Sequence, residues 1–235
     1  MGSFNGVIET RARGIIITID GPAGSGKSST AKRVAQLLSY LYLDSGAIYR
    51  AVTLQALRLD AHFSDEEALE EIAKTARIEF GNRDGIHTVY LQGEDVTEQI
   101  RCPEVTRAIA PVASSPRVRA LLIPKQRALG AEGGIVAEGR DMGSVVFPDA
   151  ELKIYMVASI RTRSRRRMRD METMGKMEPL SRIERDIEQR DYSDRIRAVS
   201  PLVKPKNALM IDTSEMSFED QVDIIVTKAR ERGAL

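Results

Sequence analysis

Residues 21–28, Gly-Pro-Ala-Gly-Ser-Gly-Lys-Ser, follow a run of β-branched residues and precede a segment typical of a helix. They fit the pattern G-x-x-x-x-G-K-[ST] at every fixed position. In such a loop the glycines let successive backbone N–H groups turn inward around an anion, and the next helix directs its positive end to the same place. The spacing therefore predicts a binding site for the phosphates of a nucleoside triphosphate. The residues expected to form it are Gly21, Pro22, Ala23, Gly24, Ser25, Gly26, Lys27, Ser28 and Ser29.

Two side chains of this loop carry chemistry. We expect Lys27 to reach the β- and γ-phosphates and the Ser28 hydroxyl to ligate Mg²⁺. The motif leaves the fate of the γ-phosphate open, because GTPases, motor and transport ATPases and small-molecule kinases all use it. A second site must decide the reaction.

The elements around the loop follow an alternating order. Strand-like apolar runs alternate with helix-like segments, which predicts an α/β fold of three layers with a parallel sheet at its centre. Strands are expected over residues 14–20, 40–43, 134–137, 152–157 and 208–211. Helices are expected over residues 26–41, 47–59 and 218–232, with a capping turn at 44–46. Residues 76–93 break this order, since they alternate apolar and polar around an Asn-Arg-Asp-Gly turn and predict a small antiparallel hairpin.

Composition limits the class of protein. The chain has 235 residues, a net charge of +1 and 5% aromatic residues, which argues against a nucleic-acid partner. One cysteine, Cys102, excludes a disulfide framework and fits a reducing cytosol. No apolar run approaches the ~20 residues of a membrane span. We therefore expect a cytoplasmic protein without a membrane partner, in which residues 1–13 form an N-terminal extension.

Four segments are candidates for the second site, and each mixes arginine with a carboxylate or a hydroxyl. They are residues 44–50, 116–119, 138–143 and 190–197. Arginine binds phosphate through paired N–H groups, and Asp or Ser can hydrogen-bond a ribose or a base. The chain holds only two histidines. A phosphate acceptor is already an anionic nucleophile and needs no positioned base, so a nucleoside monophosphate fits better than an alcohol.

From about residue 14 to its end the chain resembles the bacterial cytidylate (CMP/dCMP) kinase family of P-loop nucleoside monophosphate kinases. The resemblance rests on IDGPAGSGKSS, LDSGAIYRAVTLQAL, SPRVRALL, EGRDMGSVVFPDA and RDYSDRIRAVSPL. It implies a kinase domain over residues 14–235, with a core (14–62 and 111–235), a monophosphate-binding insert (about 63–110) and a short helical lid (about 160–180). It also implies a monomer that uses Mg²⁺ and ATP to phosphorylate CMP or dCMP in pyrimidine metabolism.

The resemblance also assigns roles to single residues. The acceptor phosphate would be held by Arg50, Arg140 and Arg197. The ribose would contact Arg190 and Asp194, in a pocket also lined by Ser45 and Tyr49. The base would be read by Arg119 and Asp141. The last assignment has independent sense, because cytosine presents an amino donor beside two acceptors, whereas uracil would leave a buried carboxylate unpaired.

Three lid arginines, Arg163, Arg166 and Arg167, lie three and four positions apart and so share a helix face. We expect this face to meet the transferring phosphoryl group when the lid closes, which makes the three arginines catalytic candidates together with Lys27. Arg161, Arg165 and Arg169 fall on other faces and are expected to be solvated.

Two departures from the family pattern bear on specificity. Ala110 stands where we expect a serine that helps to read the base, which puts the sharpness of the cytosine preference in question. Glu138 replaces an aspartate and keeps its charge. The alternatives are a P-loop kinase for UMP, another monophosphate or a small alcohol, and a regulatory P-loop protein that hydrolyses nucleotide slowly.

Overall fold

The computed structural model describes residues 14–83, 86–173, 175 and 177–234. These residues form two compact units. The first is Asp44–Ala131, and the second combines residues 14–43 with 132–234. The predicted N-terminal extension, the centre of the hairpin turn at 84–85 and residues 174 and 176 of the predicted lid lie outside the described residues.

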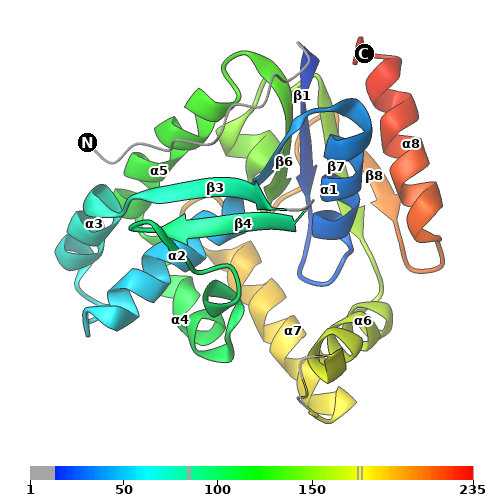
Figure 1. Cartoon of the computed structure of the whole chain (residues 1–235). Helices are drawn as coiled ribbons and strands as arrows, with labels where there is room; N and C mark the ends of the chain where they lie inside the picture. Colours follow the sequence, from blue (N-terminus) through cyan, green and yellow to red (C-terminus); the bar gives the residue numbers. More distant parts are fainter. Residues whose placement is uncertain (1–13, 84–85, 174, 176, 235) are drawn as a thin grey trace. The chain divides into compact units, whose positions relative to one another are not determined.

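The second unit is built on a five-stranded sheet with the order β2-β6-β1-β7-β8 (Figure 1). Its strands are β1 (Gly14–Asp20), β2 (Leu41–Asp44), β6 (Gly133–Gly139), β7 (Leu152–Val157) and β8 (Leu209–Asp212). Strand β1 pairs in parallel with β6 and β7, and β7 pairs in parallel with β8. The carboxyl ends of these strands therefore share one edge, where open α/β sheets bind ligands.

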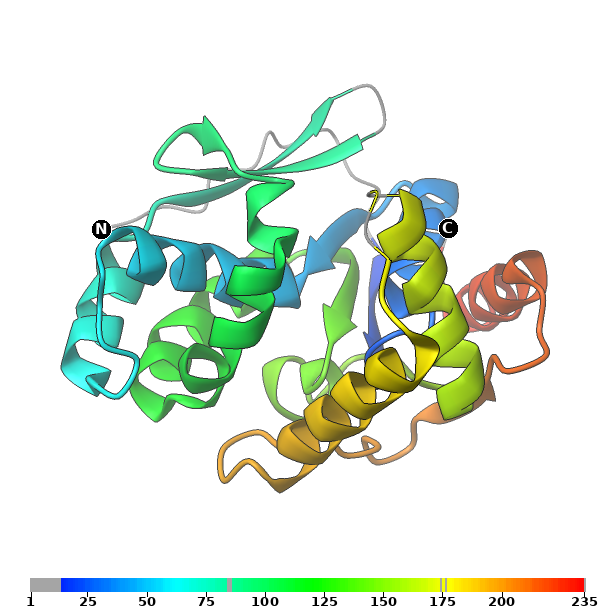
Figure 2. The ribbon, with the colours of Figure 1, turned by 90° about the horizontal axis from the view of Figure 1, so that it is seen from below.

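Four helices and one short turn complete the second unit. They are α1 (Lys27–Leu38), the π-helical turn η2 (Met142–Val146), α6 (Ile160–Thr173), α7 (Leu180–Ile196) and α8 (Phe218–Arg230). Helices α6 and α7 lie side by side in both ribbon views (Figures 1 and 2). Helix α1 ends earlier than predicted, because Ser39 adopts a left-handed φ of 55° that stops the helix before β2.

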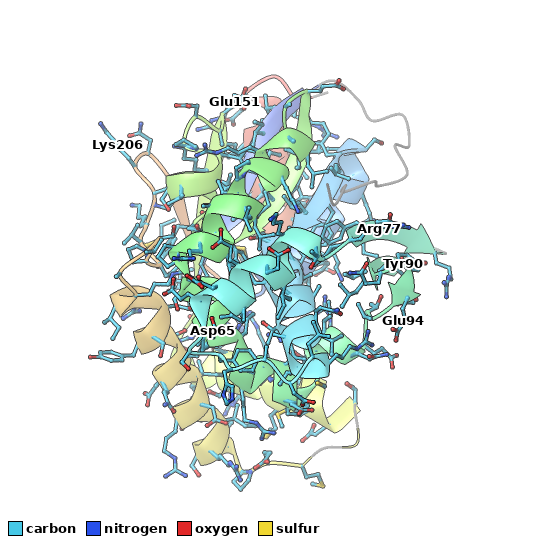
Figure 3. The ribbon with its side chains drawn as sticks, turned by 90° about the vertical axis from the view of Figure 1, so that its left-hand side faces the viewer. Asp65, Arg77, Tyr90, Glu94, Glu151 and Lys206 are labelled. Carbon is cyan, nitrogen blue, oxygen red and sulfur yellow. The ribbon has the colours of Figure 1, made fainter. Side chains whose placement is uncertain are left out.

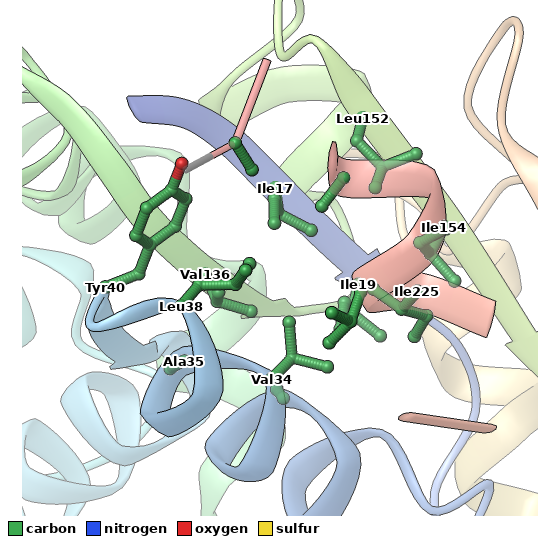
Figure 4. Close-up of a cluster of buried hydrophobic side chains, with 14 of the residues drawn as sticks. Ile17, Ile19, Val34, Ala35, Leu38, Tyr40, Val136, Leu152, Ile154 and Ile225 are labelled. Atoms are coloured by element: carbon green, nitrogen blue, oxygen red, sulfur yellow. The ribbon is translucent and has the colours of Figure 1, made fainter. Parts of the chain in front are cut away.

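The core of the second unit follows from the alternation of β1. Side chains of a strand point to opposite faces in turn, so Ile17 and Ile19 share one face. Both are fully buried in a cluster with Val34 of α1 and Ile225 of α8 (Figure 4). Thr18 and Asp20, the last residue of the strand, are also fully buried, and their side chains lie on the opposite face, where η2 contacts β1.

The first unit joins helices to a small antiparallel sheet. The helices are α2 (Ser45–Arg58), α3 (Glu66–Thr75), the 3₁₀ turn η1 (Gln99–Arg101), α4 (Pro103–Ser114) and α5 (Pro116–Leu129). The strands are β3 (Ile78–Arg83), β4 (Ile86–Leu91) and β5 (Glu94–Asp95), in the order β3-β4-β5. Tyr90 of β4 and Glu94 of β5 are labelled on this sheet in Figure 3. Glu94 pairs with Arg58 of α2 at 2.8 Å.

The predicted fold class is confirmed: a parallel sheet with helices and a small antiparallel sheet. No helix was predicted over α3, α4 or α5. Helices α4 and α5 each begin with a proline and hold a second one inside, Pro111 and Pro124, which is untypical of a helical pattern. Along the described ranges, no helix has the length and apolar character needed to cross a bilayer.

Candidate functional site

The phosphate-binding loop lies between β1 and α1. Gly24 and Gly26 have φ angles of 75° and 92°, a left-handed conformation that glycine adopts without strain. Gly26 is also the residue before α1, so the first N–H groups of that helix open toward the loop. Lys27 begins α1 and donates to the Pro22 carbonyl, which directs its ammonium group back over the loop.

Glu138, near the end of β6, is the carboxylate that contacts the phosphate-binding loop. Its Oε1 accepts hydrogen bonds from the Ser28 hydroxyl at 2.6 Å and from the Tyr42 hydroxyl at 3.2 Å. Its Oε2 lies 3.8 Å from Lys27 Nζ, and the side chains of Lys27 and Glu138 are 9% and 4% exposed. A buried carboxylate is thus held between the cation and the hydroxyl that the motif singles out.

Two residues shortly after Glu138, Arg140 and Asp141, each form an ion pair. Arg140 Nε donates to Asp194 of α7 at 2.7 Å, and Arg197 lies 3.8 Å from Asp141. Burial alone would lower the pKa of Arg140. The negative charges of Asp194 and, to a smaller extent, Glu138 outweigh this effect, so the pKa of Arg140 is raised. Burial likewise opposes ionisation of Asp194, yet Arg140 holds the pKa of this carboxyl below its usual value. Both groups are therefore charged at neutral pH.

Two arginines of the predicted lid face, Arg163 and Arg166, contact the phosphate-binding loop directly or through Thr213. Arg163 is buried, pairs with Asp191 of α7 at 2.5 Å and donates to the Ala23 carbonyl of the loop at 3.2 Å. Arg166 donates two hydrogen bonds to Thr213, whose hydroxyl donates to the Ser25 carbonyl at 2.9 Å. These two arginines thus tie α6 to the phosphate-binding loop.

The remaining arginines of α6 lie further from the loop contacts. Arg167 is half-buried on the same helix. Arg161, Arg165 and Arg169 are exposed, which confirms the prediction that they are solvated.

Four predicted substrate residues belong to the first unit. Asp44 caps α2 through the N–H of Ala47, and the next residue, Ser45, is buried in the first turn. One turn later, the ring of Tyr49 lies beneath the guanidinium of Arg119 of α5, whose central carbon is 5.3 Å from the centre of that ring. Arg50 donates to the carbonyl of Ile100 and to the hydroxyl of Thr106.

The structure brings most of the predicted residues of the second unit into contact. Lys27 and Ser28 meet through Glu138, Arg140 binds Asp194, and Asp141 pairs with Arg197. Arg190 of α7 helps to lower the pKa of Asp194. Ser29 is exposed on α1. Ser45, Tyr49, Arg50 and Arg119 are described within the first unit alone.

Several residues at or beside this site had no predicted role of their own. They are Asp20, Tyr42, Glu138, Asp191 and Thr213. Glu138 and Asp191 lie in the candidate segments 138–143 and 190–197, and Glu138 could have been assigned to the loop because it stands near the end of a buried strand at the same sheet edge. The partners of Asp191 and Thr213 come from α6, which lies far from both in the sequence.

The oxygen donors at the loop suit a magnesium ion. Mg²⁺ prefers oxygen ligands and is usually bound by one or two protein groups together with phosphates and water. The Ser28 hydroxyl and the Glu138 carboxylate are such groups, and they are already in contact. Among the residues that the structure describes, no cluster of three or more His, Cys, Asp or Glu side chains forms an all-protein metal cage.

Fold and site together define a P-loop nucleotide-binding protein of the α/β class, with an arginine- and carboxylate-rich cluster beside the loop. The family model described as "Cytidylate kinase" matches residues 17–231. The chain belongs to the cytidylate kinase family.

The chain is also similar to several known proteins. The chain is 46% identical to a protein named cytidylate kinase from Chloroherpeton thalassium, over 92% of this chain and 93% of that protein. A cytidylate kinase from Desulforamulus reducens is also 46% identical, over 90% and 95% of the two chains. Among solved structures, the chain is similar to shikimate kinase from Bacteroides thetaiotaomicron, with 11% identity, a TM-score of 0.47 and coverage of 92% and 97%.

Proposed function

We propose that this chain transfers the γ-phosphoryl group of ATP to CMP or dCMP, which gives ADP and CDP or dCDP. The proposal is supported by membership of the cytidylate kinase family over residues 17–231. The observation that carries it is the set of contacts made by residues 138–141, at the end of β6. Within four residues, Glu138 contacts the phosphate-binding loop, Arg140 pairs with Asp194 of α7, and Asp141 pairs with Arg197, the residue that follows α7.

The donor nucleotide occupies the loop after β1. Backbone N–H groups of the loop and of the start of α1 bind its phosphates, and Lys27 neutralises charge on the β- and γ-phosphates. The lid arginines Arg163 and Arg166 already contact loop carbonyls directly or through Thr213. We assign to Arg163, Arg166 and Arg167 the stabilisation of charge on the transferring group.

Magnesium fits this donor site. Ser28 would hold the ion, with Glu138 as the neighbouring carboxylate, and the ion would neutralise charge on the triphosphate. The chain itself keeps the hydroxyl and the carboxylate in contact. The ammonium group of Lys27, 3.8 Å from Glu138 Oε2, stabilises the charged form of the carboxylate.

The acceptor phosphate is itself the nucleophile. One of its oxygens forms a bond to the γ-phosphorus while the bond from that phosphorus to the β–γ bridging oxygen breaks, and ADP leaves with the bonding electrons. From the family resemblance we assign the acceptor phosphate to Arg50, Arg140 and Arg197. Asp141 accepts from the cytosine amino group and Asp194 binds the ribose, while Arg190, Arg119, Tyr49 and Ser45 complete the predicted substrate residues.

A panel of acceptors tests the proposal. ADP release is coupled to a spectroscopic readout with CMP, dCMP, UMP and AMP, for the native chain, for Asp141→Ala and for Asp149→Ala. Asp149 is an exposed acid close by in sequence and serves as a control. We expect CMP and dCMP to be strongly preferred, and the preference to be lost or weakened only in Asp141→Ala.

The same assay separates the alternatives. Equal use of UMP would indicate that Ala110, in place of a serine, has relaxed base recognition. ADP release that no acceptor stimulates would contradict the kinase assignment and favour a slow nucleotide hydrolase. A monomeric state and a cytoplasmic location remain predictions, and light scattering of the purified chain tests the first.

A further inference from the structure

Asp20 is a buried carboxylate that the reaction described above does not use. It is the last residue of β1, directly before the phosphate-binding loop, and it is fully buried. Because side chains alternate along a strand, it points away from the cluster around Ile17 and Ile19, toward the face that carries η2.

The carboxylate binds the turn that follows Arg140 and Asp141. Asp20 Oδ1 accepts from the Met142 N–H and Oδ2 accepts from the Gly143 N–H, each at 2.8 Å. These N–H groups begin η2, where a helical turn offers no acceptor of its own. Met142 and Gly143 are both buried, so their N–H groups need an acceptor inside the protein. One side chain of β1 therefore satisfies both donors.

The fit on this face is close. A Cβ added at Gly143 would lie 2.7 Å from Thr18 Oγ1 and 3.3 Å from Asp20 Oδ2. The turn can approach β1 only because residue 143 has no side chain. By contrast, the Thr18 hydroxyl, on the same strand and face, makes no hydrogen bond within the described part of the chain.

The titratable groups around Asp20 come from the residues that follow β6 and from β7. Burial raises the pKa of Asp20 to about 7, the N–H groups of Gly143 and Met142 oppose this, Asp141 raises the pKa further and Arg140 lowers it. Tyr155 of β7 lies opposite Asp20 in the sheet. Burial of the Asp20 carboxylate is unfavourable, and the hydrogen bonds from the two backbone N–H groups offset part of this cost.

We propose that Asp20 is a positioning residue for recognition of the acceptor nucleotide. By holding the N–H groups of Met142 and Gly143, it sets the backbone that carries Arg140 and Asp141, although no contact of its own with the nucleotide is required. The inference rests on the proposed function, since it concerns the residues assigned to the acceptor's phosphate and base.

The test compares two conservative changes on the same face of β1. Asp20→Asn keeps the shape but turns an amide N–H₂ toward a backbone N–H, so one of the two hydrogen bonds is lost. Thr18→Val also keeps the shape and removes a hydroxyl that makes no hydrogen bond to the turn. We expect Asp20→Asn to raise the KM for CMP by on the order of tenfold and to weaken the preference for CMP over UMP. We expect the KM for ATP to change less than about twofold, and Thr18→Val to change neither KM.

Asp20→Asn with a native KM for CMP would overturn the inference, as would an equal rise in the KM values for CMP and ATP, which indicates general loosening. Gly143→Ala provides a second route if Asp20→Asn does not fold, because it displaces the turn while the carboxylate stays. It should give the same selective rise, and a native KM for CMP in this variant would equally overturn the inference. A native chain without CMP-stimulated ADP release would instead contradict the proposed function.

Discussion

The Ser28 hydroxyl donates a 2.6 Å hydrogen bond to Glu138 Oε1, which joins the phosphate-binding loop to the end of β6. The same carboxylate faces Lys27 at 3.8 Å. Loss of its charge would remove the attraction between this carboxylate and the buried ammonium group and leave the hydroxyl with a weaker acceptor. Glu138 is therefore central to the donor site even though it lies about a hundred residues further along the chain than the loop it serves.

We predict that Glu138→Gln lowers kcat by roughly 10- to 100-fold, because hydrogen bonds to charged groups contribute about 1.5–3 kcal/mol. The concentration of Mg²⁺ needed for half-maximal activity should also rise. Steady-state kinetics at several Mg²⁺ concentrations measure both effects. Tyr42→Phe is the control, since it removes one hydrogen bond to the same oxygen of Glu138 but leaves the charge of the carboxylate in place, and it should change kcat by less than about threefold. Native Mg²⁺ dependence in Glu138→Gln would refute this role.

The strands and the loop could be predicted because their signals are local. Residues 14–20 and 152–157 are apolar runs of strand length, and the structure has strands with the same bounds. The hairpin followed from alternation around a turn, and β3 and β4 pair as expected. Helices α4 and α5 were missed because Pro111 and Pro124 interrupt their patterns.

Tertiary partners could not be predicted in the same way. Arg163 was expected on the lid face, but its buried partner Asp191 comes from another helix and is one of many acids in that region. The contact of Asp20 with the N–H groups of Met142 and Gly143 joins residues more than a hundred positions apart, and backbone donors leave no trace in a sequence. The roles of Arg50, Arg119 and the lid arginines remain predictions from the family resemblance.

The buried pair Arg163–Asp191 should dominate the stability of the α6–α7 contact. Both side chains are 8% exposed, and Asp191 Oδ1 has no hydrogen-bond partner among the described residues. Removing one partner leaves an uncompensated buried charge, so we expect Arg163→Met to lower the free energy of unfolding by about 3–5 kcal/mol. Urea denaturation measures it. Arg165→Met, on the exposed face of α6, should cost less than about 0.5 kcal/mol. Equal effects of the two changes would contradict a buried ion pair.

Asp20 gives the stability of the protein a pH dependence of defined sign. Its pKa is about 7 in the folded chain against an ordinary value of 3.8, with burial as the main cause. The folded state therefore binds the proton more tightly, and the contribution of Asp20 to the free energy of unfolding falls as pH rises from about 4 to about 7, by up to roughly 1.4 kcal/mol per pH unit. Above pH 7 it stays constant.

Urea denaturation of the native chain and Asp20→Asn across this range isolates the effect. The difference between their free energies of unfolding should decrease with rising pH, because other groups, such as Asp194, contribute equally to both. A difference that stays flat or increases between pH 4 and pH 7 would show that Asp20 is ionised throughout.

Arg119 offers a test of base recognition in the first unit. Its guanidinium lies over the ring of Tyr49, donates to the Ala113 carbonyl at 3.2 Å and is 2% exposed. Arg119→Lys keeps the charge but loses the planar fork that can pair with a base edge while stacking on an aromatic ring. We expect the KM for CMP to rise on the order of tenfold while the KM for ATP stays within about twofold. Arg117→Lys is the matched control on the same helix, where Arg117 is exposed and pairs with Glu70 at 2.9 Å. If both variants keep the native KM for CMP, Arg119 serves the packing of the first unit and does not read the base.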